Sequence, residues 1–99
     1  GCTLYTGSLS SGGAAIQPGG TYYYSSLSGA HQGWLVGPAG TDFDLYLQKW
    51  NGSAWANVAS GITSSNSETV SYSGTAGYYQ WRVVSYTGSG AYNLWLKRP

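Results

Sequence analysis

The most constraining feature of this sequence is the run TDFDLYLQKW at residues 41–50, in which apolar and polar side chains alternate. Successive side chains of a strand point to opposite faces, so Phe43, Leu45 and Leu47 share one face. The other face carries Asp42, Asp44, Tyr46, Gln48 and Trp50. This alternation predicts the central strand of an antiparallel sheet with one buried face.

Seven further stretches favour strands because they combine β-branched or aromatic residues with flanking glycine-rich turns. They are residues 4–9, 21–27, 31–36, 55–59, 68–72, 78–86 and 91–96. Residues 10–20 are rich in glycine and contain Pro18, which predicts turn or irregular structure. Asn51-Gly52 predicts a tight turn. We expect an all-β fold: one domain over residues 1–99, an antiparallel β-sandwich of the jelly-roll type with about eight strands.

Composition narrows the class of protein. Charged residues make up 7% of the chain, against about 25% in an ordinary soluble domain. Aromatic residues make up 16%, which together with the strand pattern argues against disorder. The only basic pair is Lys97-Arg98, so no nucleic-acid partner is expected. No apolar run approaches the roughly 20 residues of a membrane span, so no membrane partner is expected either.

Two longer segments resemble the bacterial pre-peptidase C-terminal domain, in the version carried by secreted proteases of soil actinobacteria. They read GTDFDLYLQKWNGSAW at residues 40–55 and SYSGTAGYYQWRVVSYTGSGAYNLWL at residues 71–96, and the YTGSLSSGG and HQGWL runs fit the same pattern. The resemblance implies a small, monomeric, extracellular β-sandwich appended to a secreted hydrolase, a protease in the first place. Such domains are not catalytic; some are similar to collagen-binding modules and some bind calcium.

Catalytic motifs are not found, and we expect no enzyme. No serine stands in a G-x-S-x-G elbow. His31 is the single histidine and is interpreted as a structural or surface residue. With Cys2 as the single cysteine, neither an internal disulfide nor a three- or four-ligand zinc site is expected. Two aspartates one strand repeat apart cannot flank a sugar bond as glycosidase carboxylates do.

Asp42 and Asp44 are the candidate calcium ligands, because the neighbouring GPAGT turn offers backbone carbonyls. The whole chain has only three acids, however, so such a site would be poor in charge. We therefore interpret the two aspartates as acceptors of hydrogen bonds from backbone N–H groups or from threonine and tyrosine hydroxyls. No cofactor is expected, and calcium should change the thermal midpoint little.

The aromatic residues suggest a binding surface, since five tryptophans and ten tyrosines exceed what so small a core encloses. Trp34, Trp55 and Trp81 are predicted to lie in the core. The predicted ligand-binding strip comprises the outward-facing Tyr46, Trp50, Arg82, Tyr86 and Trp95. Exposed rings stack on sugars or on peptide side chains. The expected partner is an insoluble protein or polysaccharide polymer, or else the parent catalytic domain. Alternatives are a carbohydrate-binding module and a structural or removable secretion domain.

Overall fold

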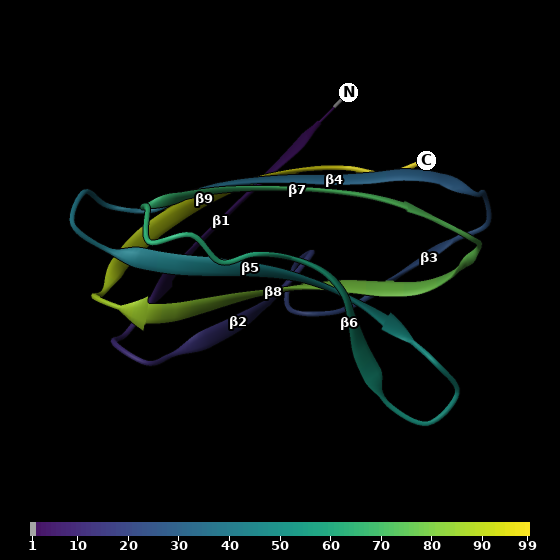
Figure 1. Ribbon diagram of the computed structural model, residues 1–99, viewed down its shortest axis with the longest axis horizontal. Helices are drawn as coiled ribbons and strands as arrows, with labels where there is room; N and C mark the ends of the chain where they lie inside the picture. The colour runs from purple at the N-terminus through teal and green to yellow at the C-terminus, as the bar shows by residue number, and fades with distance from the viewer. Residues whose placement is uncertain (1) are drawn as a thin grey trace.

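The structure is a computed structural model that describes residues 2–99. These residues form nine strands in two antiparallel sheets packed face to face (Figure 1). The strands are β1 (Thr3–Leu9), β2 (Ala14–Gln17), β3 (Tyr23–Ser25), β4 (Gly29–Val36), β5 (Asp42–Trp50), β6 (Trp55–Gly61), β7 (Ser67–Gly74), β8 (Gly77–Thr87) and β9 (Gly90–Lys97). The predicted all-β sandwich is confirmed.

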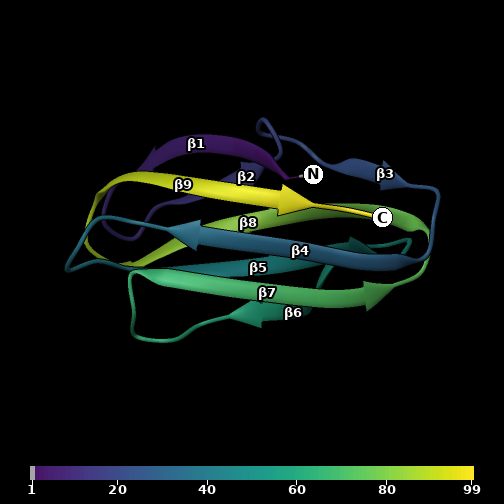
Figure 2. The same ribbon diagram turned by 90° about the horizontal axis from the view of Figure 1, so that it is seen from above.

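The first sheet has the strand order β1-β9-β4-β7, and the second has the order β2-β8-β5-β6. Figure 2 shows the first sheet in front of the second, with β1 at one edge and β7 at the other. In the second sheet, β2 pairs with residues 81–84 of β8 and β3 pairs with residues 77–79. These two short strands therefore lie one after the other along the same edge of β8.

The core lies between the two sheets and follows the predicted alternation. Phe43, Leu45 and Leu47 of β5 are fully buried. The exposed fractions of Tyr79, Trp81 and Val83 of β8 do not exceed 1%. Across the sandwich they meet the inward side chains of the first sheet: Leu35, Val70, Tyr92, Leu94 and Leu96. The buried face predicted from the sequence for Phe43, Leu45 and Leu47 is confirmed.

Residues 10–20 differ from the prediction, because they contain β2. Ala14–Gln17 pairs with β8, and the N–H of Ser85 donates to the carbonyl of Gly13 at 2.8 Å. The long β8 leaves one edge open, and a short segment between two glycine-rich turns can pair there although it has no strong strand pattern of its own. Residues 2–99 thus form nine strands rather than the predicted eight, and β3 is shorter than the predicted 21–27.

The predicted tight turn is present between β5 and β6. The N–H of Asn51 donates to the carbonyl of Ala54 at 3.1 Å, and Asn51 Oδ1 accepts from the N–H groups of Ser53 and Ala54, both at 2.9 Å. Gly52 has a φ of +96°, a conformation that glycine adopts without steric cost. This turn sets the register in which Trp50 faces Trp55.

Two of the three tryptophans predicted for the core are elsewhere. Trp81 is 1% exposed and lies in the core, whereas Trp34 and Trp55 are only half-buried. Trp34 is the Cα partner of Trp95 in the first sheet, on the face opposite to the buried Leu35 and Leu94. The sandwich places its surplus aromatic side chains on its outer faces. Within residues 2–99 we find no helix that could cross a membrane.

Candidate functional site

The end of the β5–β6 hairpin carries two adjacent tryptophans. Trp50 is the last residue of β5, Trp55 is the first of β6, and the two are Cα partners. Their ring centroids lie 5.5 Å apart with an interplanar angle of 62°. Because β5 alternates, Trp50 points to the outer face of the second sheet, away from Leu47 and the core. The turn therefore presents an adjacent pair of rings, one exposed and one half-buried, at the surface.

Two tyrosines complete a pocket around this pair. Tyr22, just before β3, lies 5.8 Å from Trp55 and 5.6 Å from Tyr78 between ring centroids. Trp50, Trp55, Tyr22 and Tyr78 line a depression of about 300 Å³, which we call the aromatic pocket. Tyr24 extends it, with its ring centroid 4.9 Å from that of Tyr78.

The aromatic pocket has the chemistry of a binding surface. Trp50, Tyr22 and Tyr78 are 40%, 53% and 45% exposed, so large apolar faces remain in contact with water. A gathering of exposed apolar side chains is typical of an interaction site, whereas isolated ones are ordinary. None of the four lining residues is charged. The pocket can pack on sugar rings or apolar side chains and donate hydrogen bonds from hydroxyl and indole groups.

The predicted ligand-binding strip is not one surface. Tyr46 and Arg82 are Cα partners on β5 and β8, as expected of neighbouring long strands. Trp50 and Tyr86 lie at opposite ends of the β5–β8 pair. Tyr86 of β8 is 72% exposed, and a register shift leaves it without a Cα partner on β5. Trp95 belongs to the first sheet, on the other side of the sandwich. Grouping it with the others was wrong, because alternation separates inward from outward side chains but does not say which sheet they belong to.

Tyr22, Trp55 and Tyr78 were not predicted as site residues. Two signals were present in the sequence. Tyr78 has the same parity as Arg82 on β8, and the Asn51-Gly52 turn pairs Trp50 with Trp55 directly across the hairpin. Tyr22 gave no such signal, since its position depends on β3 lying along the edge of β8.

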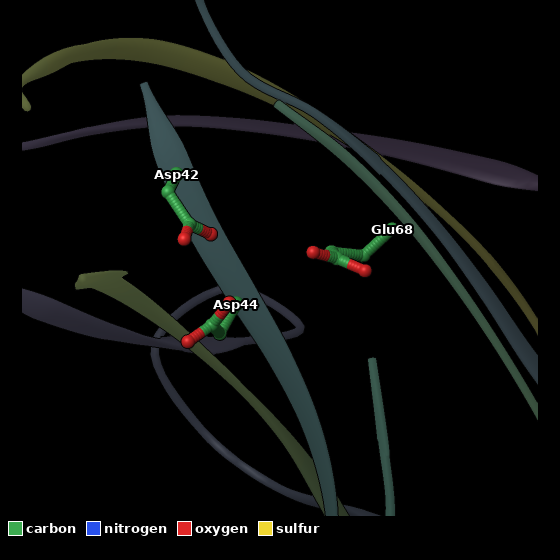
Figure 3. Close-up of side chains that lie close together, drawn as sticks. All are labelled: Asp42, Asp44 and Glu68. Atoms are coloured by element: carbon green, nitrogen blue, oxygen red, sulfur yellow. The ribbon is translucent and has the colours of Figure 1, made fainter. Parts of the chain in front are cut away.

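A second cluster gathers the acids. Asp42 and Asp44 of β5 and Glu68 of β7 have carboxylate oxygens within 4.8 Å of one another (Figure 3). In Figure 3, Glu68 approaches from the strand facing β5, and its carboxylate points toward the two aspartates. The pairing of β5 with β6 ends at Leu45 and Gly61, so residues 42–44 have a free edge there. Carboxylates from the two sheets meet at this edge.

The hydrogen bonds predicted for the aspartates are missing. Asp42 Oδ1 and Asp44 Oδ1 are both buried and have no hydrogen-bond partner within residues 2–99. Asp44 is only 7% exposed although it lies on the outward parity of β5. Burial, and then Asp42 and Glu68, raise the pKa of Asp44 to about 6. The interpretation of both aspartates as satisfied hydrogen-bond acceptors was therefore wrong.

His31 is a core residue, as the structural interpretation expected. It is fully buried, its Nδ1 lies 2.7 Å from the Tyr23 hydroxyl, and its ring centroid is 4.0 Å from that of Tyr79. Burial lowers the pKa of His31, and the positive charges of Lys49 and Arg98 lower it further. The histidine is enclosed among aromatic rings and is not accessible to a substrate.

Two solved structures share this fold over nearly the whole chain. One is a mitogen derived from Yersinia pseudotuberculosis, with a TM-score of 0.76 and 15% identity, covering 100% of this chain and 86% of that one. The other is the pre-peptidase C-terminal domain of a collagenase from Bacillus anthracis, with a TM-score of 0.76 and 20% identity, covering 97% and 89%. No family model matches the sequence. The resemblance to pre-peptidase C-terminal domains is confirmed for the fold.

Proposed function

We propose that this chain, which shares its fold with the pre-peptidase C-terminal domain of a collagenase, is a non-catalytic accessory domain of a secreted bacterial hydrolase. A protease of the actinobacterial type is the expected parent enzyme. The domain holds the enzyme on an insoluble polymer outside the cell. The observation that carries this proposal is the aromatic pocket, an uncharged depression lined by four exposed or half-buried rings.

The tilt of the rings disfavours a flat crystalline polymer. Trp50 and Trp55 are inclined by 62°, and Tyr22 and Tyr78 by 81°. A flat crystalline polysaccharide would be matched by coplanar rings, whereas tilted rings form a cradle for a group that projects from a chain. A protein fibre whose side chains include proline rings offers such groups, and so does a single flexible glucan chain. The absence of charge in the lining favours a neutral partner.

Weak contacts suffice when the ligand is a repeating polymer. A stacked aromatic ring contributes about 1 kcal/mol beyond the area that it buries. Two or three rings therefore give modest affinity for one repeat, and a domain tethered to an enzyme rebinds at the next repeat. This matches an accessory role, because firm attachment to a single repeat would stop the enzyme from moving along its substrate.

The experiment is retention of the chain on insoluble collagen, chitin, cellulose and β-glucan. We expect retention on collagen or amorphous glucan, and a five- to tenfold loss, equivalent to about 1 kcal/mol, in Tyr78→Ala and in Trp50→Ala. Trp95→Ala and Tyr86→Ala are matched controls, since they remove a half-buried and an exposed ring from other parts of the surface. Thermal melts verify that each variant folds.

Three results would count against this proposal. Equal retention of wild type and both pocket variants would place the binding surface elsewhere, and loss in Trp95→Ala alone would place it on the first sheet. If wild type binds none of the polymers but docks on its parent catalytic domain, the aromatic pocket is an intramolecular interface and polymer binding should be abandoned.

A further inference from the structure

Three amide side chains form a hydrogen-bonded row on the outer face of the second sheet. Gln80 of β8 donates from Nε2 to Oε1 of Gln48 on β5 at 2.8 Å, and Gln48 donates from Nε2 to Oδ1 of Asn57 on β6 at 2.9 Å. Gln80 and Gln48 are half-buried, and Asn57 is exposed. We call these three residues the amide row. It crosses three neighbouring strands, a span of about 9.4–9.8 Å at the usual strand spacing.

The amide row runs beside the aromatic pocket. Each of its members stands two residues from a ring of the pocket on the same strand: Gln80 from Tyr78, Gln48 from Trp50, and Asn57 from Trp55. Residues two apart in a strand share a face and lie about 6.8 Å apart. A row of rings and a row of amides therefore lie side by side across β8, β5 and β6.

A β-bulge in β6 builds both rows. Asn57 and Ala59 pair with successive residues of β5, so Val58 has no partner there. Regular pairing continued from Ala59 would turn Asn57 and Trp55 to the inner face. The bulge reverses this parity and turns both side chains outward, while Val58 packs against the core. Bulges commonly re-aim side chains in this way at functional sites.

The amide row is ordered but not saturated. An amide group has two N–H donors and a carbonyl oxygen with two lone pairs. Gln48, in the middle, uses one N–H and one lone pair within the row, so it keeps one donor and one acceptor position. Asn57 donates to neither partner in the row and keeps both of its N–H groups. Because the side chains already hold one another, less entropy is lost when a ligand binds them.

We propose that the aromatic pocket and the amide row together bind a single chain of a neutral polysaccharide. This inference rests on the proposed function, because it names the class of polymer that the same surface takes. Sugar rings stack on aromatic faces, and their hydroxyls donate and accept hydrogen bonds as amides do. A sugar ring seated in the pocket would direct the hydroxyls of one edge toward the amide row. None of the residues in the pocket or the row is charged, which suits an uncharged ligand.

A protein fibre matches the two rows less well. Its backbone N–H and C=O groups are mostly used in hydrogen bonds within the fibre, so few remain for the amide row. An apolar side chain of the fibre would fill the aromatic pocket and leave the amides facing water. The hydroxyls of a single glucan chain, in contrast, stand out from its rings and remain available. The amide row is therefore the feature that distinguishes a polysaccharide from a protein ligand.

The first measurement is calorimetric titration of the whole chain with a soluble β-glucan. Gln48→Leu removes the central amide and keeps a side chain of similar size. We expect it to weaken the affinity about five- to tenfold, the usual effect of losing one or two neutral hydrogen bonds. Gln32→Leu is the matched control, because it makes the same replacement at a half-buried position on the outer face of the first sheet. If Gln48→Leu does not fold in a thermal melt, Asn57→Ala at its exposed position gives the same test.

A second ligand separates recognition of hydroxyls from stacking. The fully methylated form of the same glucan keeps its rings but has no hydroxyl donors. We expect wild type to bind it more weakly than the unmodified glucan, and Gln48→Leu to lose affinity for the unmodified glucan only. Equal losses for both glucans would mean that the substitution disturbs the aromatic pocket, and they would overturn the role of the amide row.

The remaining outcomes separate this inference from the proposed function. If wild type binds the glucan and both Gln48→Leu and Asn57→Ala bind it equally well, the amide row is not part of the site, although polymer binding stands. If wild type is retained on collagen but does not bind the glucan, the assignment to a polysaccharide is wrong, whereas the accessory role stands. If wild type binds no polymer at all, the proposed function fails and this inference fails with it.

Discussion

The indole rings of Trp50 and Trp55 lie edge to face, with centroids 5.5 Å apart, across the turn that joins β5 to β6. The backbone turn at Asn51 and the ring pair fix the same register, one through hydrogen bonds and the other through side-chain packing. The outer end of the hairpin is therefore ordered before any ligand arrives. Such preorganisation lowers the entropy cost of binding.

A double-mutant cycle should measure the energy of this pair. We expect Trp50→Ala and Trp55→Ala to be coupled by about 0.5–1.5 kcal/mol in the free energy of unfolding, determined by urea titration. The control cycle combines Trp50→Ala with Trp95→Ala, which lies in the other sheet and should add to within about 0.3–0.5 kcal/mol. Additivity in both cycles would mean that the two rings touch without stabilising the hairpin.

The alternation along β5 should be visible in stability. Leu45 is fully buried between the sheets, so Leu45→Ala should lower the free energy of unfolding by about 2–5 kcal/mol. Tyr46 follows on the opposite face and is only half-buried, so Tyr46→Ala should cost clearly less. Chemical denaturation of the two variants gives the comparison. A larger loss in Tyr46→Ala would show that the faces of β5 have been assigned the wrong way round.

Gly33 is needed for the close packing of the two sheets. A Cβ at this position would lie 2.8 Å from Cζ3 of Trp81 and 3.1 Å from Cδ2 of Leu45. Since both neighbours are fully packed core residues, we expect Gly33→Ala to destabilise the fold by about 1–3 kcal/mol. The exposed Ser71→Ala on the adjacent strand β7 should change stability by less than about 0.5 kcal/mol. Equal unfolding midpoints for the two variants would contradict this packing.

The single histidine should titrate below its usual range. Burial, Lys49 and Arg98 all lower the pKa of His31 in the folded state, so its ring resonances should give an NMR titration midpoint below about 6.5. The unfolded chain then binds more protons than the folded one as the pH falls below that value. His31 therefore contributes stability at higher pH that is lost on acidification. A midpoint at or above about 6.5 would contradict the enclosed site.

Asp44 opposes His31 in the pH dependence of stability. Because its pKa is raised, Asp44 is more protonated in the folded than in the unfolded state between about pH 3.8 and pH 6. Protonation of Asp44 therefore favours folding as the pH falls through that window. The effect of His31 is therefore measured most cleanly in the Asp44→Asn background. There, we expect the free energy of unfolding, from urea titrations, to decrease as the pH falls through the upper end of that window. An increase would contradict the lowered pKa of His31.

The local sequence pattern was sufficient to predict most of the strands. The alternation in residues 41–50 predicted both the strand and its buried face, because side-chain direction in a strand depends only on parity. The Asn51-Gly52 turn was predictable for the same local reason, since it depends on backbone conformations of adjacent residues. Ala14–Gln17 was not, because so short a strand forms only where β8 offers it an edge.

The candidate sites depended on tertiary structure. The sequence determined that Trp50 and Trp95 point outward, but only the packing of two sheets decided that they lie on opposite sides of the sandwich. The sequence likewise showed how few acids the chain has, yet nothing in it places Glu68 of β7 beside Asp44 of β5. Parity acts within one strand, whereas the meeting of two strands from different sheets depends on the register, twist and edges of the whole fold.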